Sequence, residues 1–197
     1  MSTATQIQRG KAHGPGMAAG ERQASFESAV LVHLDSAYTL ARYLTRNAGA
    51  AEDIVQEALV RAYRHFGSQR VDNARAWLLA IVRNCFLPWN ERDGRSEEPL
   101  LEGEREPSAE VEGQDPETPE SILIQHQESR AIRAAVEELP HLFREVLVLR
   151  DIEDMSYREI ADVTGVPIGT VMSRLARARK MFASAWTALN VAQEVER

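Results

Sequence analysis

Residues 156–182 read SYREIADVTGVPIGTVMSRLARARKMF, and no other stretch of the chain constrains its fold as much. Ser156 lies three residues before Glu159, which is the spacing of a reciprocal capping box at the start of a helix. Gly165 stands where a chain leaving a helix often needs a positive φ, and Pro167 blocks the first helix but suits the first turn of the next. The stretch therefore predicts two helices joined by a sharp turn, a helix-turn-helix.

The second helix of this pair separates apolar from basic side chains. Its apolar residues recur every three or four positions and so share one face: Val171, Leu175, Ala178 and Phe182. The other sides carry small and basic residues, and no acid occurs between Asp162 and Glu194. Small residues let a helix approach a DNA groove, while basic ones can contact phosphates or guanine edges. The expected DNA contacts are Gly169, Thr170, Ser173, Arg174, Arg177 and Lys180. The alternative is an ordinary helical hairpin with a basic solvated face.

Charge is distributed unevenly along the chain. The 197 residues have a net charge of −7, which is unexpected for a DNA-binding protein. Residues 94–120, however, hold ten acidic residues against two arginines, so the remainder is close to neutral. The same segment contains four prolines and few large apolar side chains, as is typical of a solvated linker. We therefore expect two small folded domains joined by a flexible acidic linker at residues 94–119.

The composition argues against several classes of protein. Hydrophobic residues make up 44% of the chain and charged residues 27%, as in soluble globular proteins. No apolar run is long enough to span a membrane, and the N-terminal residues lack the apolar centre of a signal peptide, so we expect a cytoplasmic protein without membrane insertion. A single cysteine and five scattered histidines predict no disulfide, no metal site and no cofactor. Nothing resembles a nucleophile–base pair or a phosphate-binding loop, so we do not expect an enzyme.

Apolar periodicity predicts three helices in a first domain at residues 24–93. They are expected at residues 26–44, at 51–66, and from about 74 to 87, after a disordered tail at residues 1–23.

Local signals mark both ends of the third helix. Asp72 or Asn73 can cap its start. Pro88 should end or kink it near Leu87, because proline removes a backbone donor and clashes with the preceding turn.

The second domain is expected at residues 120–188, before a C-terminal tail at 189–197. It should contain a helix from Ile122 to Leu139, a short helix from Pro140 to Leu149, and the helix-turn-helix. The predicted fold class is therefore all-α, with two small helical bundles and the helix-turn-helix in the C-terminal one.

Three strings, in this order along the chain, resemble the extracytoplasmic-function sigma factors, the smallest class of the bacterial primary-sigma superfamily. The polymerase-binding helix of the family's second region is similar to AEDIVQEALVRAYRHF, and the helix that meets the promoter −10 element is similar to NARAWLLAIVRN. The family's fourth region is similar to LPHLFREVLVLRDIEDMSYREIADVTGVPIGTVMSRLARARKMF. The resemblance implies a factor that binds core RNA polymerase, directs promoter-specific transcription initiation, reads the −35 element with the basic helix and helps melt the −10 region.

The resemblance also implies sites in the first domain and further partners. The beta-prime coiled coil of core RNA polymerase should dock on Asp53, Gln56, Glu57 and Arg61. Contacts to the −10 element of promoter DNA should come from Ser68, Gln69, Arg70, Asp72, Asn73, Arg75, Arg83 and Asn84. An anti-sigma factor is a further expected partner.

The chain departs from the family pattern at several positions. Pro88 and Glu91 interrupt a stretch where the family often continues with an Asp and a pair of arginines, and Met172 stands where it often has lysine. The loop around Gln69 also lacks an aromatic residue commonly found there. Two other functions therefore remain open: a sigma mimic that titrates an anti-sigma factor, and a helix-turn-helix repressor that binds DNA as a dimer without polymerase.

Overall fold

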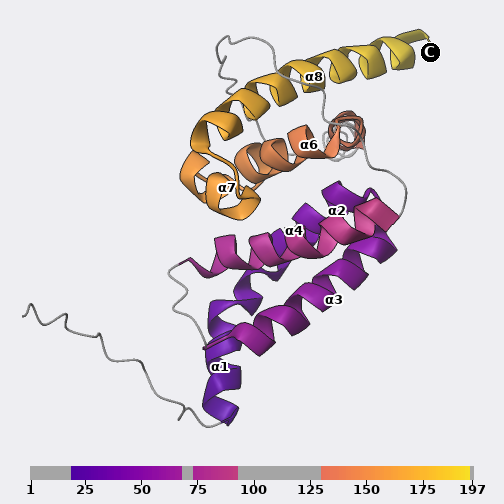
Figure 1. Ribbon diagram of the computed structural model, residues 1–197. Coiled ribbons are helices and arrows are strands. Elements are labelled where there is room, and N and C mark those ends of the chain that lie inside the picture. The colour runs from indigo at the N-terminus through magenta and orange to yellow at the C-terminus, as the bar shows by residue number, and fades with distance from the viewer. Residues whose placement is uncertain (1–18, 68–72, 93–129, 196–197) are drawn as a thin grey trace, which may run out of the picture.

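The computed structural model describes residues 19–67, 73–92 and 130–195, with the backbone alone at residue 19 and at 189–195. The elements within these ranges are helices arranged in two bundles, one above the other in Figure 1. The all-α prediction is thereby confirmed. The expected linker at 94–119 and most of the expected N-terminal tail lie outside the described residues.

The first bundle contains five helical segments in chain order: α1 (Ala19–Ala29), the 3₁₀ turn η1 (Leu31–His33), α2 (Leu34–Thr45), α3 (Ala48–His65) and α4 (Ala74–Arg92). The apolar stripes of α2, α3 and α4 pack against one another, burying Leu40, Ile54 and Leu79 among others. Asn47 caps α3 by accepting a hydrogen bond from the backbone N–H of Ala50.

The prediction of one continuous helix at residues 26–44 is wrong, because η1 separates α1 from α2. The ring of Phe26 packs edge-on against the rings of Tyr63 and Phe66, with centroids 5.2 and 5.3 Å apart. Arg22 donates a hydrogen bond to the backbone oxygen of Tyr63 at 2.8 Å. These contacts with α3 explain why residues 19–23, inside the expected disordered tail, are helical, since burial against a neighbour stabilises a helix beyond its own propensity.

Of the two outcomes expected from Pro88, an end or a kink near Leu87, the end is wrong, because the helix continues through Pro88 to Arg92. The turn after the proline is held by packing. The rings of Phe86 and Trp89 lie 6.1 Å apart, and Asn90 is buried. At the other end, the backbone N–H of Ala76 donates to Oδ1 of Asn73, which identifies Asn73 as a cap of this helix.

The second bundle contains a helix over residues 130–137, α6 (His141–Leu147), the π-helical turn η2 (Val148–Ile152), α7 (Tyr157–Thr164) and α8 (Ile168–Val195). Residues 122–129 of the helix expected at 122–139 lie outside the described residues. Helix α8 continues past residue 188, where we expected a tail to begin, and α6 packs against its first half (Figure 1).

The helix-turn-helix forms as its local signals predict. Ser156 and Glu159 make both hydrogen bonds of the capping box at the start of α7. Gly165 ends this helix at a φ of 70°, a left-handed conformation that glycine adopts without steric cost. On α8, the predicted apolar positions Val171 and Leu175 are buried. The two helices therefore meet at the expected corner.

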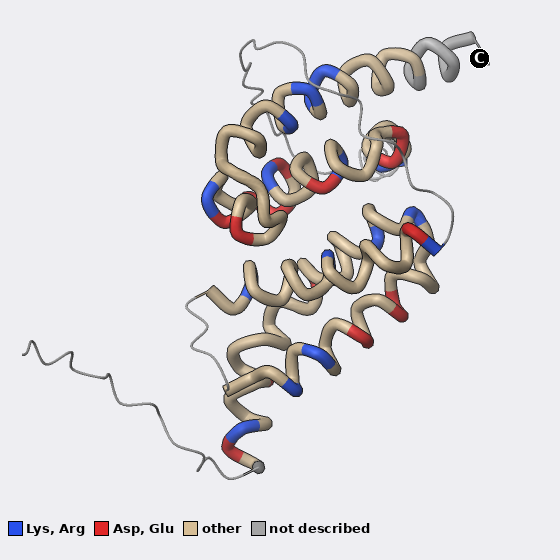
Figure 2. The backbone as a smooth tube through the Cα atoms, viewed as in Figure 1, with Lys and Arg blue, Asp and Glu red and all other residues tan. Residues whose placement is uncertain are grey.

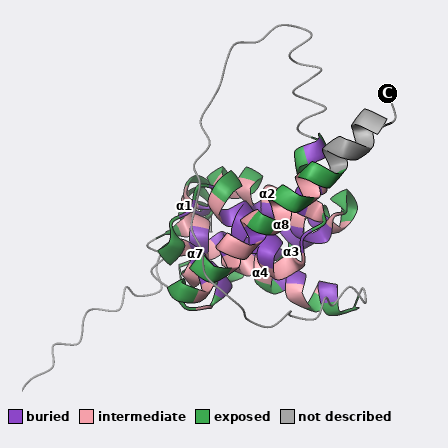
Figure 3. Ribbon diagram, turned by 90° about the horizontal axis from the view of Figure 1, so that it is seen from above, coloured by how far each residue is buried: buried purple, intermediate pink, exposed green. Residues whose placement is uncertain are grey.

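The two bundles pack against each other and share a continuous apolar core. Helix α4 contacts α7, and α2 contacts α6. Arg42 of α2 also forms an ion pair with Glu137, with 3.0 Å between Nη1 and Oε1. Seen from above, the buried residues concentrate in the middle of the molecule (Figure 3). Among the described helices, none combines the length and apolar character needed to cross a membrane.

Candidate nucleic-acid interface

The predicted DNA face of α8 is largely accessible. Gly169, Ser173 and Lys180 are exposed, whereas Thr170 and Arg177 are half-buried. Figure 2 shows basic residues along this helix. A row of small and basic side chains on an exposed helix can enter a major groove and contact phosphates on either side of it.

Arg174 differs from the other residues predicted on this face. Its Nη1 atom is buried, and within the described part of the chain it has no hydrogen-bond partner. Burial raises the pKa of the Glu145 carboxyl on α6, and the charge of Arg174 is among those that oppose this rise. The structure therefore places this side chain toward α6, apart from the exposed positions of the predicted DNA face.

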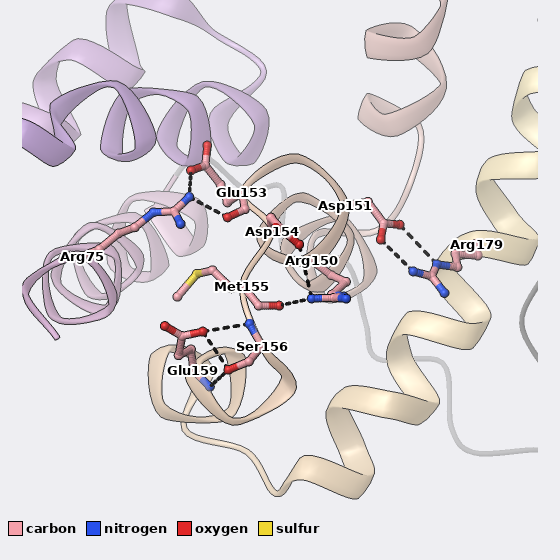
Figure 4. Close-up of polar contacts among 9 residues, drawn as sticks. All are labelled: Arg75, Arg150, Asp151, Glu153, Asp154, Met155, Ser156, Glu159 and Arg179. Carbon is pink, nitrogen blue, oxygen red and sulfur yellow. Dashed lines mark hydrogen bonds and ion pairs between the residues drawn. The ribbon is translucent and has the colours of Figure 1, made fainter. Parts of the chain in front are cut away.

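Arg179, which we did not predict as a site residue, attaches α8 to η2. Its Nε and Nη2 atoms donate to the two carboxylate oxygens of Asp151 at 3.2 and 2.7 Å (Figure 4). This bidentate pair raises the pKa of Arg179, chiefly through the hydrogen bonds to Asp151. The pairing fixes the position of α8 relative to the turn that precedes the helix-turn-helix.

Arg150 holds the chain between η2 and α7. Its Nη1 atom donates to the backbone oxygen of Met155 at 2.8 Å (Figure 4). Its guanidinium group also lies over the ring of Tyr157. Asp154, 3.6 Å from the same guanidinium nitrogen, has a φ of 48°. Asp tolerates this left-handed conformation better than most residues do. The entry into α7 is thus fixed by one arginine.

Four residues predicted to contact the −10 element are described, and three of them bind the second bundle. The Nδ2 atom of Asn73 donates to Glu159 at 2.6 Å. Arg75 donates to both the side chain and the backbone oxygen of Glu153 (Figure 4). Arg83 donates to Glu145. The fourth residue, Asn84, is exposed.

The other predicted contacts to this element lie outside the described residues. They are Ser68, Gln69, Arg70 and Asp72.

Arg83 forms the most buried of these contacts. Its Nε atom donates to Oε1 of Glu145 at 2.6 Å, and the Glu145 side chain is 2% exposed. Burial raises the pKa of the Glu145 carboxyl, while the guanidinium groups of Arg83 and Arg174 oppose that rise. The Glu145 carboxylate of α6 is therefore held by a cation of the first bundle.

The predicted polymerase-binding residues share the outer face of α3. Asp53, Gln56, Glu57 and Arg61 are all exposed. Arg61 and Glu57 form an ion pair of 2.5 Å across one helical turn. Figure 2 shows the acidic residues of α3 toward its start and the basic ones toward its end, the order that the helix dipole favours.

Two exposed apolar residues of α3 were missed from the sequence. Val60 and Tyr63 lie beside the charged residues of this face. The sequence could have identified them, because both lie outside the periodic apolar positions that form the buried side of the helix. They follow Glu57 by three and six residues. Exposed apolar side chains among charged ones are typical of a protein-binding surface.

Three acidic residues that bind the α4 face were also missed: Glu145, Glu153 and Glu159. Glu145 lies within the largely apolar stretch at residues 142–149, which is unusual for a residue type that is rarely buried without a partner. The partners of all three lie at least 62 residues away along the chain, so no local pattern identifies them. Over the described residues, no group of three or more histidine, cysteine or acidic side chains is arranged to hold a metal ion.

Two family models match the chain. Sigma-70 region 2 matches residues 30–95, and sigma-70 region 4 matches residues 129–182. These ranges contain α2 to α4 and α6 to the first half of α8, respectively.

Curated relatives extend the match over most of the chain. The ECF RNA polymerase sigma factor SigE of Mycolicibacterium smegmatis is 36% identical over 158 residues, covering 80% of this chain and 60% of that protein. The ECF RNA polymerase sigma-E factor of Haemophilus influenzae is 33% identical over 147 residues, covering 73% and 77%. The RNA polymerase sigma-H factor of Pseudomonas aeruginosa is 30% identical over 174 residues, covering 82% and 85%. The chain thus spans less than two thirds of the mycobacterial protein.

Solved structures agree with these relatives. The sigma factor RpoE of Bartonella quintana, solved in complex with the anti-sigma factor NepR, matches with a TM-score of 0.62 and 26% identity, covering 83% of this chain and 97% of that one. CnrH, solved with the cytosolic domain of CnrY, shares the fold with a TM-score of 0.59 at 24% identity, covering 84% and 90%. With both sigma-70 regions matched in order, and relatives similar over most of its length, the chain belongs to the extracytoplasmic-function sigma factors, a family of transcription initiation factors.

Proposed function

We propose that this protein binds core RNA polymerase and directs it to promoters whose −35 element is read by α8 and whose −10 element is bound by the first bundle. The observation that carries the proposal is the capped α7–α8 corner, which presents exposed Gly169, Ser173 and Lys180 in a chain that also matches region 2. Catalysis would belong to the polymerase and not to this chain. Work with polymerase implies a cytoplasmic location.

The −35 contact follows from the chemistry of the exposed face of α8. Small side chains near its start allow close approach to base edges, and Arg177 and Lys180 lie further along to meet phosphates. A single small basic surface of this kind binds free DNA weakly, because most of its affinity comes from a few phosphate contacts. Attachment to polymerase would supply the remaining affinity.

The polymerase contact is proposed on the outer face of α3. The charged group formed by Asp53, Glu57 and Arg61 would pair with complementary charges, and the exposed apolar residues Val60 and Tyr63 would supply buried area. An anti-sigma factor is a further proposed partner, supported by the solved complex of the similar RpoE with NepR.

In vitro transcription with purified core polymerase tests the proposal. Replacing Arg177 and Lys180 together by alanine should weaken promoter binding by the holoenzyme. The slope of the logarithm of its affinity against the logarithm of the salt concentration, its salt slope, should fall by about one for each lost phosphate contact. Binding to core polymerase should persist. The control replaces Arg130 and Arg133, exposed arginines of the same bundle, and should leave the promoter affinity unchanged. Loss of core binding in the double variant would contradict the assignment of α8 to DNA.

The same assay separates the two alternatives. A sigma mimic would bind an anti-sigma factor or core polymerase but yield no promoter-dependent transcripts. A dimeric repressor would bind its operator tightly in the absence of polymerase. Transcripts that start at defined promoters only when this protein is added would exclude both.

A further inference from the structure

Three polar side chains on one side of α4 are each bound by a carboxylate of the second bundle. Arg83 binds Glu145, Arg75 binds Glu153, and Asn73 binds Glu159. These residues of α4 and its cap are the described residues that we propose for the −10 element, apart from Asn84. The second bundle therefore covers the DNA side of the first.

Two of these contacts, Arg83–Glu145 and Arg75–Glu153, differ from ordinary surface ion pairs in their burial, whereas the Asn73–Glu159 contact is exposed. The side chains of Glu145 and Glu153 are 2% and 7% exposed, and those of their arginine partners are 14% and 31% exposed. A carboxylate buried to this degree depends on its partner, because an unpaired buried charge is strongly destabilising. The two surfaces are complementary in charge, which favours a specific closed arrangement.

Glu145 occupies a proposed DNA contact directly. Its Oε1 atom accepts a hydrogen bond from Nε of Arg83 on the −10 face at 2.6 Å. Arginine binds carboxylates and phosphates through the same donor geometry. A DNA phosphate and the Glu145 carboxylate are therefore alternative partners for the Arg83 guanidinium group.

We propose that Glu145, Glu153 and Glu159 form a carboxylate latch, which closes the free protein and competes with promoter DNA for the α4 face. The proposal rests on the function proposed above for α4. DNA that reaches Arg75 or Arg83 must displace a carboxylate of the latch, so the closed protein cannot use this face. The −10 contacts become available only when the bundles separate.

Distance measurements on the full chain test the closure itself. Spin labels at Glu52→Cys on α3 and Thr187→Cys on α8 occupy exposed positions, whereas the native Cys85 is buried. The free protein should give one narrow distance distribution. The double variant Glu145→Gln, Glu153→Gln should give a broader distribution at longer distance.

The matched control removes the same amount of charge elsewhere. Glu138→Gln with Asp162→Asn changes two exposed acids of the second bundle that lie outside the latch. This control should keep the narrow distribution of the parent protein, since it leaves all three carboxylates in place.

DNA binding tests the competition. The transcription assay first identifies a promoter and its −10 sequence. A fluorescent DNA single strand with this sequence is then titrated with the free full-length protein. Only the open form binds this strand, so the apparent affinity of the protein is reduced by the fraction of molecules that are open. Opening the latch removes this reduction, and we expect the double variant to bind the strand about tenfold more tightly. Unchanged affinity in an opened variant would overturn the competition, and an unchanged distance distribution would overturn the latch.

Two further results keep these outcomes apart. If the substitution Glu145→Gln prevents folding, as judged by circular dichroism, Glu153→Gln with Glu159→Gln carries the test, because glutamine also serves in a capping box. If the wild type drives promoter-dependent transcription but is open when free, the latch is wrong and the sigma function stands. A closed protein without transcripts would contradict the proposed function and leave the closure intact.

Discussion

Ile168 and Met172 are exposed on consecutive turns at the start of α8, where the helix would enter a DNA groove. They are 45% and 53% exposed, although both are apolar. Apolar side chains in a major groove can contact the methyl group of thymine, which distinguishes it from the other bases. Met172 stands where the family often has lysine, so at this residue an apolar contact to a base takes the place of a contact to a phosphate.

The substitution Met172→Lys should reverse that exchange. It adds a cation to the proposed DNA face, so we expect tighter holoenzyme binding to promoter DNA at low salt and a salt slope larger by about one. Fluorescence anisotropy over a series of salt concentrations measures both. The control Thr187→Lys places the same charge on an exposed position farther along α8. Equal effects of the two lysines would show that net charge alone sets the affinity.

At the scale of single helices, local signals and distant contacts have separate effects. The α7–α8 corner was predictable, because Ser156, Glu159 and Gly165 act within a few residues of one another. The position of α1 was not, because Phe26 packs against Tyr63, which is far away in the sequence. The contacts of Arg75 and Arg83 have the same origin. The resemblance indicated these arginines, but their carboxylate partners required the folded chain.

The cap of α7 should depend on pH. The hydrogen bonds from Ser156, then that from Asn73, hold the pKa of the Glu159 carboxyl below its ordinary value of 4.5. The stabilisation is therefore complete above about pH 4.5 and is lost as the pH falls through the lower, folded-state pKa. An NMR titration of the Glu159 carboxyl measures that pKa. In Ser156→Ala the pKa should move back toward its ordinary value, and stability near neutral pH should fall by about 1 kcal/mol.

The attachment of α1 depends on one aromatic residue. Phe26 is buried against α3, so Phe26→Ala should remove most of the apolar contact that holds α1 in place. Hydrogen exchange should then show loss of amide protection over Ala19–Ala29, while α2 and α3 keep theirs. Protection lost throughout the first bundle would instead show that α1 is part of its cooperative core.

At the scale of the whole molecule, Arg144 connects the two bundles. Its guanidinium group is buried and donates to the backbone oxygens of Tyr43 and Leu44, at the end of α2, and of Leu139. The last carbonyl groups of a helix lack partners within the helix and carry partial negative charge. A buried arginine of the second bundle thus supplies hydrogen-bond donors to the last carbonyl groups of a helix in the first.

Arg144→Met should weaken the contact between the bundles. Methionine keeps much of the apolar volume but leaves the carbonyl groups of Tyr43 and Leu44 without this donor, at a cost of about 1–3 kcal/mol. Calorimetry should show one unfolding transition for the wild type and two for the variant, as the bundles unfold separately. The exposed Arg130→Met serves as the control and should retain a single transition. A wild type with two transitions would contradict this account.

The ion pair between Arg83 and Glu145 also has an evolutionary consequence. A substitution of Arg83 that adapts the protein to a different promoter would leave a buried carboxylate without its cation. Such a change would survive only with a compensating change at Glu145. Promoter preference and the resting shape of the protein would then be inherited together, and these two positions should covary among its descendants.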